Sequence, residues 1–100
     1  MRDDSHELET QQEVELFEPK RFKVILLNDD YSTMDFVVEI LMSIFHKGLE
    51  EALSIMLAVH KSGRGVCGIY PYDIAETKSA LVRKRAKESG FPLQVSLEEC

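Results

Sequence analysis

The sequence predicts a small α+β domain in which three helices pack on one side of a three-stranded antiparallel sheet. The predicted order is β-α-α-β-α-β, and an N-terminal arm precedes it. A chain of 100 residues with 44% hydrophobic residues is enough for one modest core. Short aliphatic runs alternate with stretches of helical periodicity. Three strands cannot bury both faces of their sheet, so we expect the helices to cover one face.

The first strand and the first helix follow each other closely. Residues 22–27, "FKVILL", are aliphatic and short enough for a strand. Ser32 followed by Asp35 resembles a capping box, which predicts a helix from about Thr33 to His46. Polar residues recur every three or four positions in this segment, so only a narrow stripe of the helix should face water.

A second helix and a second strand come next. Gly48 interrupts the apolar pattern, which resumes at helical spacing over 49–61. The segment 62–65, "SGRG", predicts a turn, and 66–70, "VCGIY", predicts a strand. Gly68 within that strand indicates a bulge or a close approach of another group.

The last two elements are a helix over 71–89 and a strand over 92–97. Pro71 suits the first helical turn and Gly90 suits the helix end. The basic residues in the final turns fit a solvated face that complements the helix dipole. The segment "PLQVSL" alternates apolar and polar side chains, as a half-buried strand does.

Charge divides the chain into two parts. Residues 1–18 hold seven acidic side chains and one arginine, which account for the whole formal charge of −6. We therefore separate a flexible acidic extension, 1–19, from a core domain, 20–100. A solvated tail is the simplest interpretation of the extension. No basic stripe follows it, so we do not expect nucleic acid as a partner.

Cysteine usage and hydropathy bear on location. Cys67 and Cys100 have no metal-binding or redox spacing and cannot form a disulfide framework. The polar, acidic beginning lacks the features of a secretory signal, and no apolar run is long enough to span a bilayer. These observations predict a cytoplasmic protein without a membrane partner.

The first candidate site is the polar cluster that ends the first strand. Asn28, Asp29 and Asp30 follow four aliphatic residues directly. One interpretation is a turn whose side chains cap the next helix. The other is a receptor for a positively charged group. If the two helices are antiparallel, His60 should lie near this turn.

Apolar residues at helical spacing border the same region. Met34 and Val37 lie on the first helix, and Met56 and Val59 lie on the second. They predict either an apolar hollow beside the polar cluster or ordinary core packing. His60, near a helix end, is equally compatible with a surface or capping role.

Several motifs together resemble one family. The segments "VILLNDDYSTMDFV", "MLAVHKSGRGVCGIY", "AETK" and "FPL" occur in uninterrupted order from about Lys20 to Leu97. They resemble the ClpS family, bacterial adaptors that deliver N-degron substrates to the ClpAP protease. The resemblance implies a non-catalytic protein without a cofactor or a metal.

The resemblance also implies a ligand and its site. Asn28, Asp29 and His60 would hold the free α-amino group and the first peptide unit of a substrate, and Asp30 would add negative potential. The ligands implied are proteins that begin with Leu, Phe, Tyr or Trp, and Met34 would reject β-branched residues. The pocket for the first side chain would be lined by Ser32, Met34, Val37, Met56, Val59 and Leu93.

A second surface implied by the resemblance contacts the protease. Asp73, Glu76 and Lys78 would contact the N-terminal domain of the unfoldase ClpA. The acidic arm would be the flexible extension that family members present to the unfoldase.

Two rival functions are open to test. Cys67 with His60 suggests a thiol nucleophile and its base, and Asp29 with Asp30 suggests a carboxylate pair. However, Cys67 lies in an apolar strand, and no nucleophile elbow or phosphate-binding loop is present. The second rival is a non-catalytic interaction module of ribosomal-stalk-like fold, since such domains have a similar element order.

Overall fold

Three antiparallel strands form the sheet at the centre of the molecule. The computed structural model describes residues 20–100. The strands are β1 (Arg21–Leu27), β2 (Arg64–Pro71) and β3 (Gln94–Glu99). β1 is central, and the sheet order is β2-β1-β3. The predicted acidic extension, 1–19, lies outside the described residues.

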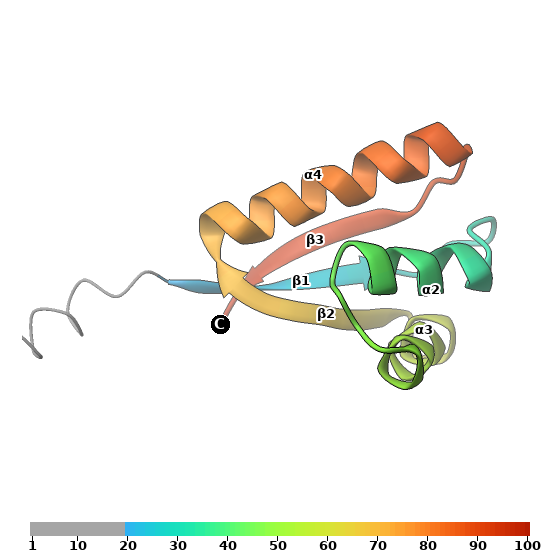
Figure 1. Ribbon diagram of the computed structural model, residues 1–100, viewed down its shortest axis with the longest axis horizontal. Coiled ribbons are helices and arrows are strands. Elements are labelled where there is room, and N and C mark those ends of the chain that lie inside the picture. Colours follow the sequence, from blue (N-terminus) through green and yellow to red (C-terminus); the bar gives the residue numbers. More distant parts are fainter. Residues whose placement is uncertain (1–19) are drawn as a thin grey trace, which may run out of the picture.

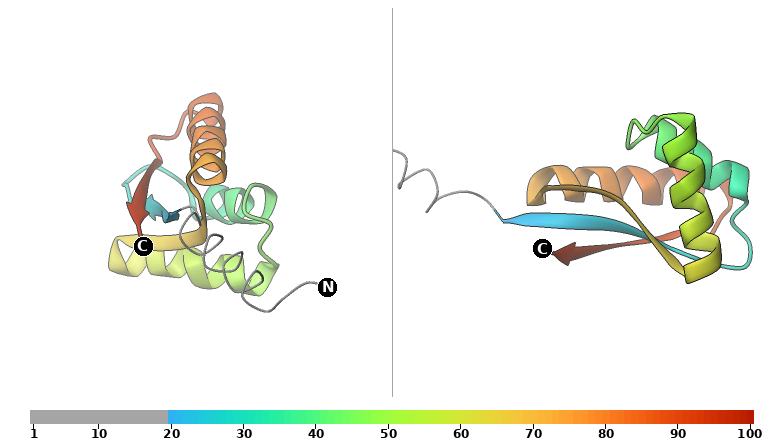
Figure 2. Two further views of the ribbon diagram at one scale, coloured as in Figure 1. Left: turned by 90° about the vertical axis from the view of Figure 1, so that its left-hand side faces the viewer. Right: turned by 90° about the horizontal axis from the view of Figure 1, so that it is seen from below.

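Three helices complete the predicted order β-α-α-β-α-β, which is confirmed. They are α2 (Met34–Ser43), α3 (Leu49–Ser62) and α4 (Tyr72–Ser89). Figure 1 shows α4 running along the sheet, whereas α2 and α3 gather at the end where β1 finishes. The views in Figure 2 show the same arrangement from the side and from below. None of these helices has the length and hydropathy that a membrane span requires.

One hydrophobic core joins all three helices to one face of the sheet. Val24 and Leu26 of β1 point into it, as strand alternation requires. They meet Ile40 and Leu41 of α2, and α3 and α4 contribute their buried faces. The core members from these two helices are Ala52, Met56 and Val59 of α3 and Ala75, Val82 and Ala86 of α4.

Among residues 20–100 no helix covers the opposite face of the sheet (Figure 2), yet Ile25 is only 1% exposed. Ile25 alternates with Val24 and Leu26, so it points away from the core. Arg64 of β2 and Glu98 of β3 form an ion pair at 3.0 Å. Arg64 pairs with Leu27 and Glu98 pairs with Lys23, so their side chains must cross β1 at the level of Ile25. This ion pair therefore covers the central strand.

The structure corrects both ends of the first helix. Thr33, not Ser32, is the N-cap of α2, and its hydroxyl accepts a hydrogen bond from the Phe36 N–H at 3.1 Å. The Ser32 hydroxyl makes no hydrogen bond to the first turn of the helix. The helix ends at Ser43 rather than His46, because His46 adopts a left-handed conformation with φ 56°.

The bulge or close approach predicted at Gly68 is confirmed. The register changes from Val24 opposite Gly68 to Ile25 opposite Val66, so Cys67 is an extra residue in β2. A β-carbon on Gly68 would overlap the Tyr70 side chain. Glycine thus lets the Tyr70 ring lie against the strand.

The remaining element boundaries differ from the predictions by one or two residues. β2 begins at Arg64, so the turn after α3 is shorter than the predicted 62–65. Pro71 occupies the N-cap of α4 rather than its first turn, and Gly90 ends the helix as predicted. β3 is shifted toward the C-terminus and spans Gln94–Glu99.

Candidate functional site

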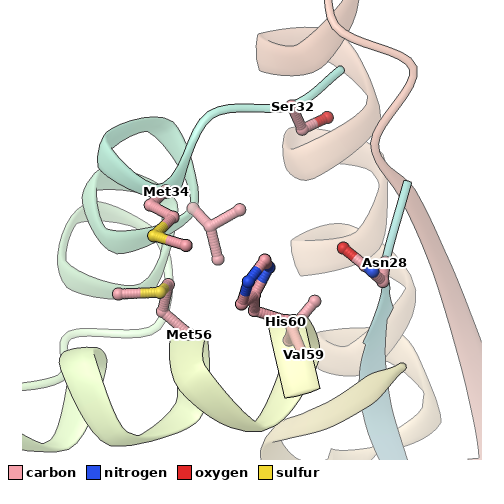
Figure 3. A pocket seen from close by; sticks show the side chains of 7 residues that line it. Asn28, Ser32, Met34, Met56, Val59 and His60 are labelled. Atoms are coloured by element: carbon pink, nitrogen blue, oxygen red, sulfur yellow. The ribbon is translucent and has the colours of Figure 1, made fainter. Parts of the chain in front are cut away.

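A pocket opens where the end of β1, the start of α2 and the C-terminal half of α3 meet. It encloses about 230 Å³ out to its open mouth. The hollow is small and open to solvent. Its lining residues are Asn28, Ser32, Met34, Val37, Met56, Val59 and His60 (Figure 3).

One side of the pocket is polar. Asn28 follows β1 directly and His60 lies in the last turn of α3. The Asn28 N–H donates to the Gly63 carbonyl oxygen at 3.0 Å, which holds the end of β1 against the end of α3. In Figure 3 the His60 ring lies between the Asn28 amide and the two methionines. The structure therefore brings together an amide and an imidazole from distant parts of the sequence, as expected.

The other walls are apolar. Met34 is the first residue of α2 and is 45% exposed at the mouth, whereas Val37 is buried one turn further on. Met56 and Val59 are buried residues of α3. Five of the six residues expected in the pocket, including Ser32, line it. The sixth, Leu93, is not among the lining residues; it is 5% exposed and belongs to the hydrophobic core.

Asp29 shapes the loop beside the pocket. Its Oδ1 accepts hydrogen bonds from the N–H groups of Tyr31 and Ser32, at 2.8 and 2.7 Å. Asp29 thus forms the predicted turn, but it does not cap the next helix, whose N-cap is Thr33. Asp29 does not line the pocket, and Asp30 is an exposed neighbour.

The Asp29 carboxylate also retains an acceptor that the protein does not use. Its Oδ2 is buried without a hydrogen-bond partner, and so is the Ser32 hydroxyl. Burial raises the pKa of Asp29, but the Ser32 hydroxyl and the backbone N–H groups of Ser32 and Tyr31 lower it by more. Asp29 is therefore an anion at neutral pH next to the polar side of the pocket.

The three residues expected to contact ClpA lie on α4. Asp73 and Glu76 are exposed in its first two turns, and Glu76 pairs with Arg83 at 3.4 Å. Figure 1 places these turns at the opposite end of the sheet from α3. Lys78 is different, because it is only partly exposed and its ammonium is used within the molecule.

The Lys78 ammonium has three intramolecular partners. It donates to the Ile44 carbonyl oxygen at 2.7 Å. It also lies 5.8 Å from the centre of the Phe45 ring and 5.2 Å from that of Tyr70. Sequence reasoning missed this role, because no local pattern links a lysine to a carbonyl 34 positions earlier.

The structure gives no support to a thiol nucleophile. Cys67 is fully buried in the core. Burial raises the pKa of its thiol to about 12, although a hydrogen bond with the Leu26 backbone and the charge of Lys47 act in the opposite direction. The side chain is therefore a neutral thiol at physiological pH and has no access to a substrate. Within residues 20–100, no three His, Cys, Asp or Glu side chains are grouped so that they could hold a metal ion.

Comparison with known proteins agrees with this geometry. The family model "ATP-dependent Clp protease adaptor protein ClpS" matches residues 17–96. The ATP-dependent Clp protease adapter protein ClpS of Wolinella succinogenes is 68% identical over 94 residues, which are 94% of this chain and 92% of that protein. The adapter of the same name from Campylobacter jejuni is 54% identical over 91 residues, covering 91% of this chain and 95% of that protein.

A solved structure gives the same result. Agrobacterium tumefaciens ClpS2, bound to L-phenylalaninamide, is 37% identical and superposes with a TM-score of 0.80. The match covers 83% of this chain and 100% of that chain. Sequence and fold agree over nearly all of the described residues, and the chain therefore belongs to the ClpS family of Clp protease adaptors.

Proposed function

We propose that this adaptor binds proteins with a free N-terminal Leu, Phe, Tyr or Trp and delivers them to the ClpA unfoldase of the ClpAP protease. The observation that carries the proposal is the composition of one small pocket: Asn28 and His60 on one side, and an apolar hollow on the other. Such a pocket suits a ligand that has a cation and a large apolar group on the same carbon atom. An unblocked N-terminal residue with a large side chain is such a ligand.

The polar side fits an α-amino group. This group titrates near about 7.7 to 8, so most of it is ammonium at neutral pH. Desolvating an ammonium requires hydrogen-bond acceptors or a counter-charge. The Asn28 amide oxygen and a ring nitrogen of His60 are acceptors, and the Asp29 carboxylate, which lies beside the pocket without lining it, adds negative potential.

The apolar side fits one large side chain. Burying a Leu or Phe side chain contributes roughly 1.5 to 3 kcal/mol. The flexible side chains of Met34 and Met56 can adapt to both branched aliphatic and flat aromatic groups. Met34 lies exposed at the mouth, where bulk on the β-carbon of the ligand would meet it.

A ligand seen in a relative supports this choice. L-Phenylalaninamide, bound to Agrobacterium tumefaciens ClpS2, has a free amino group, a large apolar side chain and an amide in place of the next peptide bond. It therefore combines the three features that the pocket of this chain would select.

Delivery would use a separate surface. Asp73 and Glu76 are exposed at the far end of the molecule, so a partner could contact them while the pocket is filled. We assign this surface, together with the Lys78 region of α4, to the N-terminal domain of ClpA, in the cytoplasm. A degradation assay with purified ClpAP and a Phe-initiated substrate tests this part, with Asp73→Lys as the variant and Lys84→Glu as the control on the same helix.

Peptide titration tests the binding proposal. Fluorescence anisotropy is measured with peptides that differ only at the first residue, each with a free and an acetylated amine. We expect Leu, Phe, Tyr and Trp peptides to bind and acetylation to abolish binding, because the acetylated group has no charge and more bulk. Equal binding of acetylated peptides would contradict the amine site. Absence of binding to every peptide would favour an interaction module of ribosomal-stalk-like fold.

A further inference from the structure

Four side chains of α3 form one row along the helix. Leu49, Leu53, Met56 and His60 are spaced at i, i+4, i+7 and i+11, which places them on one face of an α-helix. Met56 and His60 line the pocket. The row therefore begins in the pocket and continues along α3 to its first turn.

The other end of the row is exposed apolar surface. Leu53 is 40% exposed and Leu49 is 56% exposed, so a large part of each residue is open to solvent within residues 20–100. Polar side chains of Glu50, Glu51 and Ser54 flank the two leucines in sequence and are exposed. A contiguous apolar surface with a polar border marks an interaction site more often than isolated exposed leucines do.

The dimensions of the row match a short stretch of extended peptide. At about 1.5 Å per residue, Leu53 lies about 5 Å from Met56 along the helix and Leu49 lies about 11 Å from it. An extended chain advances about 3.3 Å per residue. The two leucines are therefore about two to three residues away from the pocket for a peptide that follows α3.

We propose that Leu53 and Leu49 form a second subsite, which binds an apolar side chain at about the third or fourth residue of the peptide whose first residue occupies the pocket. This inference rests on the proposed function and adds a feature to the substrate class. The continuity of the row with the pocket supports it, because Met56 lines the pocket and no charged residue of α3 lies between Met56 and the two leucines in that row. Both contacts belong to one peptide, so the second contact forms within an existing complex. It therefore raises the affinity even if it is weak by itself.

The test uses peptides with a free N-terminal Phe and a polar tail of Ser and Gly. One Leu is placed at position two, three, four, five or eight, and affinities are measured by fluorescence anisotropy. We expect Leu at position three or four to tighten binding about 3- to 10-fold, since only part of a leucine side chain is buried on a helix surface. Leu at position eight serves as the distant control.

The matched variants are Leu53→Ser and Leu81→Ser. Leu81 is 44% exposed on α4 and is not near the pocket lining, so it controls for loss of a surface leucine. The ratio of affinities for Leu-tailed and polar-tailed peptides should fall to about 1 in Leu53→Ser and stay unchanged in Leu81→Ser. Leu49→Ser provides a second variant if Leu53→Ser does not fold, as judged by circular dichroism.

The outcomes separate this inference from the proposed function. If polar-tailed Phe peptides bind but Leu at no position improves affinity, the second subsite is wrong and the pocket stands. The same conclusion follows if the gain persists in both Leu53→Ser and Leu49→Ser. If Phe peptides fail to bind whatever their tail, the proposed function itself is wrong.

Discussion

The Lys78 ammonium donates a hydrogen bond to the Ile44 carbonyl oxygen at 2.7 Å, and this contact ties α4 to the end of α2. The carbonyl belongs to the C-cap residue of α2, so it has no partner within that helix. The rings of Phe45 and Tyr70 lie within reach of the same ammonium. A residue expected to contact ClpA thus also has a structural role.

Lys78→Met should destabilise the protein, because it removes the charge that binds the Ile44 carbonyl oxygen. Methionine keeps most of the side-chain stem. A hydrogen bond to a charged group contributes about 1.5 to 3 kcal/mol, and the aromatic contacts add to it. We expect the free energy of unfolding in urea to fall by about 1 to 3 kcal/mol. Lys84→Met, at an exposed position on the same helix, should change it by less than about 0.5 kcal/mol. Equal stability of the two variants would contradict the structural role.

Met34→Ala should admit peptides that begin with Ile or Val. Met34 is exposed at the mouth of the pocket, where its side chain would meet bulk on the β-carbon of the first residue. We expect measurable affinity for Ile and Val peptides in anisotropy titrations, where the unmodified protein has little. Met42→Ala is the control, because Met42 is an exposed methionine of the same helix outside the pocket. No gain for β-branched peptides would mean that another residue excludes them.

His60→Ala and Asn28→Ala should each weaken binding of a free-amine Phe peptide by about 10- to 100-fold. Each variant removes one acceptor for an ammonium, and such hydrogen bonds are worth about 1.5 to 3 kcal/mol. A matched peptide lacking the α-amino group completes a double-mutant cycle with each variant. The substitutions should cost little against that peptide. Equal losses for both peptides would remove these residues from the amine site.

Asp29→Asn should reduce stability in a pH-dependent way. In the folded protein burial raises the pKa of Asp29, but the hydrogen bonds from Ser32 and Tyr31 lower it by more. The net effect is a lowered pKa. The charged form therefore stabilises the fold above the unfolded pKa of about 3.9, and this contribution is lost as pH falls through the lower folded pKa. We expect a difference of about 1 kcal/mol in unfolding free energy at pH 7.

The difference in unfolding free energy between the unmodified protein and Asp29→Asn should disappear in acid. Urea unfolding of the unmodified protein and of Asp29→Asn, followed from about pH 6 to about pH 2, should give curves that converge below about pH 4. Asp30→Asn, at the exposed neighbouring position, serves as the control. A gap between the curves that stays constant with pH would show that the Asp29 charge does not stabilise the loop.

Gly48→Ser should stabilise the protein. Gly48 is the N-cap of α3 with φ −70° and ψ 167°, a conformation open to any residue, and it makes no side-chain cap hydrogen bond. No atom lies within 4 Å of the position that a β-carbon would take. A serine hydroxyl can accept from a free N–H of the first turn, and the unfolded chain loses freedom. We expect a gain of about 0.5 to 1 kcal/mol in thermal or urea unfolding. Gly48→Ala measures only the effect of reduced freedom in the unfolded chain. If Gly48→Ser is no more stable than Gly48→Ala, the serine hydroxyl does not cap the helix.

The sequence by itself determined the elements and most of the pocket. The order of strands and helices, the end of the last helix at Gly90 and the bulge near Gly68 follow from local rules of periodicity and backbone conformation. Five of the six expected pocket residues line the hollow. Helical spacing is what places Met34 beside Val37 and Met56 beside Val59, and that spacing is visible in the sequence.

Tertiary structure decided the rest, because it depends on contacts between residues far apart in the chain. Leu93 lies in the core rather than in the pocket, the Arg64–Glu98 ion pair covers Ile25, and Lys78 is bound to Ile44. Partners of this kind are chosen by the packing of whole elements against one another, which local patterns do not encode. The end of β1 meets the end of α3 for the same reason, and this meeting is what places Asn28 beside His60.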